Sequence, residues 1–389
     1  MIVLLTIHGI GFQRAPSGLA ATDGYADPLH EHLRGHLGDA LGDDPKRVAQ
    51  QGRGPVYAES SYPPHSNQTE SGIGRLGSWT TSGSVDREGM DLAPTGAEIA
   101  HVALVYSGLE EQQGDVTALL GLNSLSAPVT DYATVGGLVQ MALHDLEALR
   151  QHPPGDGSTT PSLRPRTDTT MHRGIVSRIL GRAAPAQADS SATGPLGILH
   201  TVEDDVAAYV TRNEHRERVR GFIRDAASRL LGRDDVDGLV VNGHSNGTVM
   251  GFDLVSALSP PSAEGVRALI TSGSPLRKYV DLLDWGRDAG NLRLLRDGWT
   301  NFWDPLDPVA DPLAQPYGWK RGQALVANPG GSMFVIHDPN TGTQGAIAVV
   351  DEQVDNVKDS QGGGLRAHNY WDNDAFAVGA AAVLTRATG

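Results

Sequence analysis

The sequence predicts an α/β protein whose central sheet is mostly parallel and carries helices on both faces. Three observations lead to this fold class. Apolar runs of strand length recur along the chain, segments with apolar residues at helical spacing separate them, and one strand passes through a serine-bearing turn into a helix. Strands buried on both faces of a parallel sheet contain such continuous apolar runs. Their alternation with helices indicates that the sheet is parallel.

The N-terminal part supplies the first predicted strands and one helix. Residues 2–7 are almost uniformly apolar and are expected to form a central strand. A helix is predicted over Pro28–Leu41, followed by a short extra strand at Val56–Ser61. Residues 63–94 are rich in Ser, Gly, Thr and Asn, which indicates a long loop. The next strand is expected at residues 99–106.

A long insertion, residues 107–200, separates that strand from the strand leading to the serine. Its first part, 115–149, contains apolar stretches that could form one or two helices. Its second part, about 151–194, is dominated by Pro, Ser, Thr, Gly and Ala, with a short helical candidate at 172–180. That composition predicts a flexible segment. We expect one domain over 1–389, with the insertion as a candidate lid or cap.

The alternation of elements continues to the C-terminus. A long amphipathic helix is expected at 201–231, because its apolar residues recur at helical spacing. The elements expected after it are a strand at 239–241, a helix ending near Leu258, a strand at 266–271, a helix around 276–283, a strand at 299–303, a hairpin pairing 333–337 with 346–350, and a last helix at 374–385.

Composition excludes several classes of site and partner. The net charge of −15 disfavours nucleic acid and anionic membranes as partners, because phosphates would be repelled. The absence of cysteine excludes disulfides, thiolate zinc sites and cysteine nucleophiles. No apolar run approaches bilayer length, so no transmembrane segment is expected. The apolar N-terminus lacks a basic region and a cleavage site, so we expect a core strand there and not a signal peptide. A cytoplasmic location is therefore expected.

The motif that points most directly to a reaction is Gly243-His244-Ser245-Asn246-Gly247. Glycine makes up 48 of the 389 residues, so the bare pattern Gly-x-Ser-x-Gly is weak. Its context is what matters, because the pattern has meaning between a strand and a helix. Here it follows the apolar run 239–241 and precedes a helical segment. The alternative is an ordinary polar turn; the context favours Ser245 as a nucleophile.

A nucleophilic serine needs backbone donors for the oxyanion that forms during acyl transfer. The backbone amide of Asn246 is the first expected donor. The second commonly comes from the loop after the first core strand, which here reads His8-Gly9-Ile10-Gly11. We assign the Ile10 amide, with His8 and Gly9 as supporting residues of the loop.

The acid is expected after a later strand, in the segment from Asn301 to Asp311. Three aspartates are candidates there: Asp304 lies close to the strand end, Asp307 lies in an Asp-Pro-Val turn that can aim its carboxylate across the sheet, and Asp311 comes last. We favour Asp307, with Asp304 as the alternative. An aspartate before proline also commonly forms turns, which is the structural role expected of the others.

The base is expected last, on the loop before the final helix. His368 occupies this position, just after the glycine run 362–364. His8 precedes the nucleophile, His337 ends a predicted strand, and His244 neighbours the serine but is expected to point elsewhere. The resulting order Ser245, Asp307, His368 is that of α/β-hydrolases, and it differs from the chymotrypsin-like and subtilisin-like orders.

These motifs resemble the α/β-hydrolase superfamily on its lipase and esterase side. The His-Gly-Ile-Gly loop resembles that of small bacterial lipases, in which the residue after His-Gly supplies an oxyanion amide. The segments 273–276 and 303–309, with His368-x-Tyr370-Trp371, also resemble bacterial serine hydrolases of uncertain substrate. The resemblance implies a Ser-His-Asp triad acting on esters. This chain departs from the family pattern in that the first two strands of the full fold are expected to be absent. The insertion has no counterpart there.

The sequence therefore predicts a serine hydrolase for carboxylic esters of short to medium acyl chains, without cofactor or metal. A lipase with the insertion as lid, an amidase or thioesterase, and a non-catalytic binding scaffold are the alternatives. The expected partner is a small-molecule or lipid ester. Trp285, Trp303 and Trp371 could line an acyl pocket, although tryptophans are more often core residues. A dinucleotide site is disfavoured because Gly9-Ile10-Gly11-Phe12 lacks the third glycine of that fingerprint.

Overall fold

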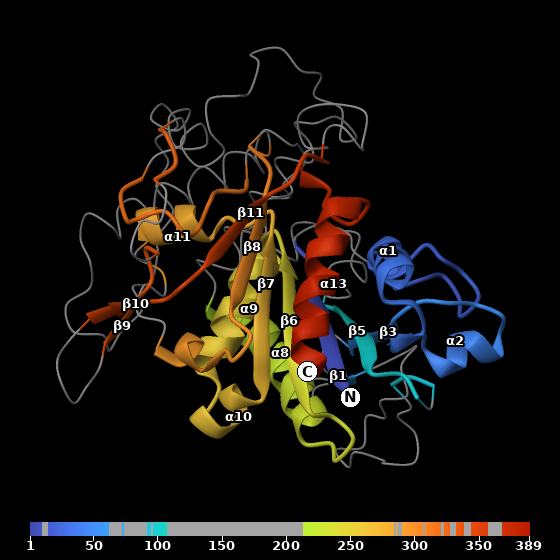
Figure 1. Ribbon diagram of the computed structural model, residues 1–389. Helices are drawn as coiled ribbons and strands as arrows, with labels where there is room; N and C mark the ends of the chain where they lie inside the picture. Colours follow the sequence, from blue (N-terminus) through green and yellow to red (C-terminus); the bar gives the residue numbers. More distant parts are fainter. Residues whose placement is uncertain are drawn as a thin grey trace, which may run out of the picture.

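The computed structural model describes residues 1–9, 15–61, 72–73, 92–94, 96–106, 213–283, 285, 290–305, 307, 309–319, 323–326, 332–337, 344–356 and 368–389. Within these ranges the chain forms an open nine-stranded sheet with helices packed on it (Figure 1). The predicted α/β class is thereby confirmed. The insertion 107–200, with its predicted lid, helices and flexible part, lies outside the described residues, as do Ile10 and most of the predicted loop 63–94.

The centre of the sheet is β1 (Ile2–Ile7), which pairs in parallel with β5 (Ile99–Val105) on one side and β6 (Gly238–His244) on the other. All three strands are buried along their whole length. This is the environment in which continuous apolar runs are stable, because neither strand face meets water.

The sheet extends outward from this centre in both directions. Its order is β11 (Val350–Gln353), β8 (Trp299–Trp303), β7 (Val266–Ser272), β6, β1, β5, β3 (Val56–Ser61) and β4 (Gly72–Ile73), while β2 (Leu41–Gly42) also pairs with β5. Every pair is parallel except β3 with β4. The predicted mostly parallel sheet is confirmed, and the carboxyl ends of its parallel strands meet at one edge.

Helices cover both faces of the sheet (Figure 1). One face carries α1 (Asp27–Leu37) and α13 (Asp374–Thr388), and the other carries α8 (Asn213–Leu231) and α9 (Asn246–Ala257). Shorter helices lie in the connections: α2 (Pro45–Ala49), α10 (Pro260–Glu264), α11 (Leu276–Leu283), η1 (Gly38–Ala40) and η4 (Gly290–Leu294). None of the described helices is long and apolar enough to cross a membrane.

Strand β1 shows how the sequence divides the core in two. Val3, Leu5 and Ile7 pack into the cluster beneath α8 and α9. Ile2 and Leu4 pack into the cluster beneath α1 and α13. Successive side chains of a strand point to opposite faces, so a run of apolar residues builds both cores at once.

The predicted first helix and the predicted hairpin differ from the structure. Helix α1 ends at Leu37 and not at Leu41, because Gly38 adopts φ 57° and its amide closes the helix on the Arg34 carbonyl. The predicted hairpin consists of β9 (Val335–His337) with β10 (Gln344–Ala346), whereas Val350 starts β11 beside β8. The described part of the long helix starts at Asn213, and 201–212 lie outside the described residues.

Candidate active site

Ser245 occupies the turn between β6 and α9 in a strained backbone conformation. Its φ is 56° and its ψ is −128°. Among the described non-glycine residues, only Gln51 shares a positive φ. A side chain in this region of φ/ψ space costs on the order of 1–3 kcal/mol and persists where the surrounding structure holds it. The sharp turn predicted from the motif is therefore present at this serine.

The two motif glycines are required because chain segments cross without room for a side chain. A Cβ on Gly243 would lie 2.5 Å from the carbonyl oxygen of Gly247, closer than real Cβ contacts occur. A Cβ on Gly247 would overlap with the carbonyl oxygen of Ile7 in β1. The spacing of the glycines thus follows from how strand β6, helix α9 and β1 pack around the serine.

The loop after β1 lies directly against Ser245. A Cβ on Gly9 would overlap with the Cβ of Ser245 and lie 3.0 Å from its Oγ. The carbonyl of Gly9 accepts hydrogen bonds from Nδ1 of His8 and from the Tyr106 hydroxyl, the latter at 2.7 Å. Gly9 therefore holds a fixed position beside the serine, where the proposed oxyanion loop begins.

His8 belongs to the scaffold of this loop. Its ring stacks on Tyr106 with centroids 3.9 Å apart, and the Tyr106 amide donates to its Nε2 at 3.3 Å. Burial lowers the pKa of His8 to about 3, so the ring is neutral and carries its proton on Nδ1. Both ring nitrogens are engaged in holding the loop. The supporting role of His8 in an oxyanion loop stays a prediction.

His368, which is partly buried, and Asp307 form a pair at the same end of the sheet. Nδ1 of His368 donates to Oδ2 of Asp307 at 2.8 Å, and Asp307 is fully buried. Because the carboxylate is an acceptor, the neutral ring carries its proton on Nδ1 and leaves Nε2 with a free lone pair. This Nε2 is buried without a hydrogen-bond partner among the described residues.

Asp307 is held in its charged form by its contacts. Burial by itself would raise the pKa of Asp307, but the charge of His368 and hydrogen bonds from His368, the Val309 amide and the Tyr370 hydroxyl lower it below its usual value. The Val309 amide binds Oδ1 at 2.9 Å and the Tyr370 hydroxyl binds Oδ2 at 3.0 Å. The carboxylate is thus available to orient the imidazole.

The two other aspartates of this segment contact different partners. Oδ2 of Asp304 accepts from the Asn356 amide at 2.7 Å. Asp311 forms an ion pair with Lys278. Of the three candidates for the acid, Asp307 is the one that the His368 ring contacts.

His244 connects the serine turn to His368. It was expected to point elsewhere, but its ring lies 4.7 Å from the His368 ring between centroids. Its Nε2 donates to the backbone carbonyl of His368 at 2.8 Å. Burial and the charge of His368 lower the pKa of His244 to about 3, so it is a neutral donor. The residue before Ser245 therefore holds the backbone of His368.

A second contact brings His368 to the same edge as Ser245. A Cβ on Gly273, which has φ 61°, would lie 2.7 Å from Cε1 of His368. Gly273 follows Ser272, whose carbonyl accepts from the Ser245 amide at 2.9 Å. Three segments therefore converge on one place: the loop after β6, the loop after β7 and the segment before α13.

Asn246 is the first residue of α9 and is buried. The first amides of a helix have no acceptor within the helix, so its backbone N–H is available to a ligand. Its side-chain oxygen accepts from the Tyr279 hydroxyl at 2.8 Å. The other expected oxyanion donor, Ile10, lies outside the described residues.

The three tryptophans expected near a pocket lie in or against the core. Trp303 and Trp371 are each 7% exposed, and Trp371 packs in the core beneath α1 and α13. Trp285 packs partly buried against the opposite core and donates from its ring nitrogen to Asp253.

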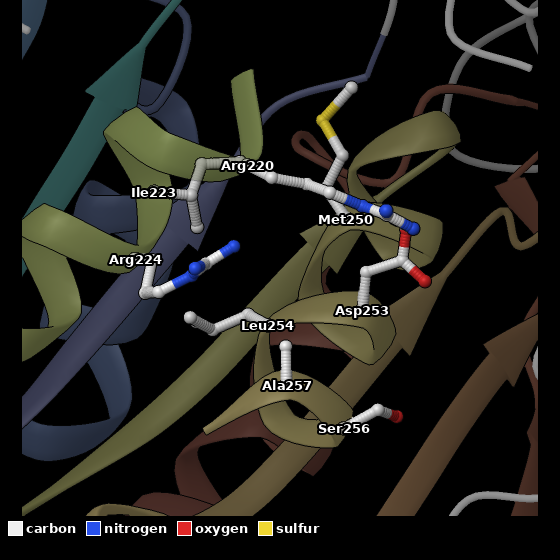
Figure 2. A pocket seen from close by; sticks show the side chains of 8 residues that line it. All are labelled: Arg220, Ile223, Arg224, Met250, Asp253, Leu254, Ser256 and Ala257. Atoms are coloured by element: carbon white, nitrogen blue, oxygen red, sulfur yellow. The ribbon is translucent and has the colours of Figure 1, made fainter. Parts of the chain in front are cut away.

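A groove between α8 and α9 has no lining residue in common with this cluster (Figure 2). Arg220 reaches across it to Asp253, with 2.7 Å between the guanidinium and the carboxylate. The other lining residues are Ile223, Arg224, Met250, Leu254, Ser256 and Ala257. Because Ser245, Asp307 and His368 are not among them, we assign no substrate to this groove.

Three tyrosines with contacts in the site were not predicted from the sequence. Tyr370 binds Asp307, Tyr106 binds the Gly9 carbonyl, and Tyr279 binds Asn246. The one available signal was the nearness of Tyr370 to His368 in the chain. Among the described residues, no group of three or more His, Asp or Glu side chains is placed to hold a metal ion.

Comparisons of the chain with protein-family models, with curated proteins and with solved structures gave no match.

Proposed function

We propose that this chain is a serine hydrolase of the α/β-hydrolase superfamily that cleaves carboxylic esters of short to medium acyl chains. The observation that carries this proposal is the pair formed by buried Asp307 and partly buried His368, which stands at the sheet edge where Ser245 occupies its strained turn. A binding scaffold needs neither a strained serine nor an imidazole oriented by a buried carboxylate. This combination is the arrangement that activates a hydroxyl as a nucleophile.

The order of elements supports the superfamily assignment. The serine follows β6 at the centre of the sheet, Asp307 follows β8, and His368 follows β11 and precedes the last helix. This is the chain order expected of the α/β-hydrolase fold, with the nucleophile on a strand–turn–helix elbow. In this assignment β1 is the strand before the oxyanion loop.

The first half of the reaction transfers the acyl group to the enzyme. Nε2 of His368 takes the proton of the Ser245 hydroxyl as Oγ attacks the ester carbonyl carbon. The carbonyl oxygen becomes an oxyanion, which the backbone amides of Asn246 and Ile10 stabilise. The intermediate then collapses: the bond to the leaving alkoxide breaks, and His368 gives its proton to that oxygen. Ser245 is left as an acyl ester.

The second half repeats the same steps with water. His368 takes a proton from water, and the oxygen attacks the acyl carbon to form a second oxyanion at the same amides. Collapse breaks the bond to Oγ, which receives the proton from His368, and the carboxylic acid leaves. Asp307 stays ionised throughout, since it orients the imidazole and stabilises its charged form.

A series of p-nitrophenyl esters from acetate to palmitate tests this proposal. We expect turnover of the shorter esters by the wild type and background rates for Ser245→Ala. Ser256→Ala, on the same helix, is the matched control and should retain wild-type rates. Full activity in Ser245→Ala would refute the proposal. Preference for the longest esters would indicate a lipase, and preference for the matching anilides or thioesters would indicate an amidase or thioesterase.

A further inference from the structure

The carboxylate of Asp307 has a second side-chain donor besides His368. The Tyr370 hydroxyl lies 3.0 Å from Oδ2, the same oxygen that accepts from Nδ1 of His368 at 2.8 Å. Two donors therefore compete for the charge on one oxygen atom. Tyr370 itself is completely buried, so water does not replace its hydroxyl at this position.

The direction of the tyrosine proton follows from its other contact. The backbone amide of Asp304 donates to the Tyr370 hydroxyl oxygen at 2.9 Å. An amide N–H cannot accept a hydrogen bond, so the single phenolic proton is directed to Asp307. The ring is also fixed, because it packs edge-on against Phe376 of α13 at 6.2 Å between centroids.

We propose that Tyr370 is a positioning residue that tunes the basicity of His368 through Asp307. Its hydroxyl takes up part of the carboxylate charge, so Asp307 pulls less strongly on the proton of the imidazolium. His368 then releases more readily the proton that it takes up as a general base in each half of the reaction. The catalytic consequence rests on the proposed function.

Within the part of the chain that the structure describes, few other groups can supply the charge that sets this equilibrium. The titratable groups there that face His368 and Tyr370 are His244 from β6 and Asp304 and Asp307 from the segment after β8. His244 is neutral above about pH 3 and contributes no charge near neutral pH. Asp304 turns Oδ2 toward the Asn356 amide. Asp307 is thus the charge in direct contact with His368.

The test is an NMR titration of the His368 imidazole in the wild type and in Tyr370→Phe. Removing the hydroxyl returns charge to Asp307, so we expect the titration midpoint of His368 to move up by about half a pH unit or more, where one unit corresponds to about 1.4 kcal/mol. The acidic limb of kcat/KM should move in the same direction. A general loss of stability would shift neither the His368 titration midpoint nor the acidic limb of kcat/KM.

Tyr57→Phe is the matched control. The Tyr57 hydroxyl also donates to a buried carboxylate, Asp27, at 3.2 Å and accepts from a backbone amide, that of Ala26, at 3.0 Å. Its loss removes the same kinds of bond at a place away from His368. We expect the His368 midpoint to stay at the wild-type value in this variant.

A second variant keeps the phenolic hydroxyl. Replacing Tyr370 by 3-fluorotyrosine strengthens the phenolic donor, so the His368 midpoint should move down. An unchanged midpoint in both Tyr370 variants, or a shift equal to that of Tyr57→Phe, would overturn the role of Tyr370. The titration does not require turnover. Failure of the proposed function would instead appear as an absence of ester hydrolysis by the wild type.

Discussion

The imidazole of His368 donates from Nδ1 to Oδ2 of Asp307 over 2.8 Å, although 61 residues separate the two in the chain. The parallel sheet makes this contact possible, because β8 and β11 are neighbours and their carboxyl ends lie together. Asp307 follows one strand and His368 follows the other. The pairing is thus a consequence of topology, and Ser245 follows β6 at the same edge.

The Asp307 carboxylate should matter far more than the neighbouring Asp304. In Asp307→Asn the amide oxygen or nitrogen faces Nδ1, so the imidazole loses the partner that orients it and stabilises its charge. We expect kcat on a p-nitrophenyl ester to fall on the order of 10³- to 10⁴-fold. Asp304→Asn retains an oxygen for the Asn356 amide and should lose less than about tenfold. Equal losses in the two variants would contradict the assignment of the acid.

The strained backbone at Ser245 should lower the free energy of unfolding of the protein. Its φ of 56° is unfavourable for serine but not for glycine. We expect Ser245→Gly to raise the free energy of unfolding by about 1 kcal/mol while removing hydrolysis. Ser245→Ala keeps the Cβ and should leave stability near the wild-type value. Urea unfolding of the three proteins measures the difference, and destabilisation by glycine would argue against backbone strain at the serine.

Gly9 should tolerate no side chain. The added methyl group of Gly9→Ala would overlap with the Ser245 Cβ, so either the serine or the loop must move. We expect a loss of kcat/KM of about a hundredfold or more, comparable to the loss of an oxyanion donor.

Gly35→Ala provides the comparison for that substitution. Gly35 lies in α1 with open space around its Cβ position. Alanine there should stabilise the protein by about 0.5–1 kcal/mol and leave hydrolysis unchanged. Equal activity in the Gly9 and Gly35 variants would show that the loop does not approach the nucleophile.

Asp43 should make the fold sensitive to acid. Burial acts to raise its pKa, but hydrogen bonds from His30 and the Gly54 amide, with the charges of His30 and Arg34, lower the pKa of Asp43 to about 2. A carboxyl group with a pKa below its unfolded value stabilises the fold above that unfolded value, near pH 4, and loses this contribution as the pH falls toward 2.

The measurement is the melting temperature of the wild type and of Asp43→Asn at a series of pH values. We expect the wild type to be more stable from pH 5 to 7 and the difference to shrink between about pH 4 and 2. A difference that stays constant over that interval would show that the charge of Asp43 does not stabilise the fold.

The strands and the serine turn could be predicted because each has a local pattern. Residues 2–7 are apolar because both strand faces are buried, and the motif glycines follow from backbone crossings at Ser245. The pairing of Val350 with β8 could not be predicted, since a short and mostly polar strand has no feature that selects its neighbour. The end of α1 depended on the left-handed conformation of Gly38, which a glycine permits but does not require.

The contacts of single side chains in the site were less accessible to prediction. His244 was expected to point away, but its ring packs beside His368 because both lie where β6 and the segment before α13 meet. Tyr370 reaches Asp307 across a long sequence separation. No periodicity or spacing in the sequence indicates either contact, because both depend on how the loops fold over the edge of the sheet.

Labelling with a fluorophosphonate probe tests most directly whether Ser245 is an activated nucleophile. The probe reacts with serines that a neighbouring base has activated, and intact-mass spectrometry counts the adducts. We predict one adduct on the wild type, located by peptide mapping at Ser245, and none on Ser245→Ala. A wild-type protein that gains no adduct, or that carries it at another residue, would contradict the account.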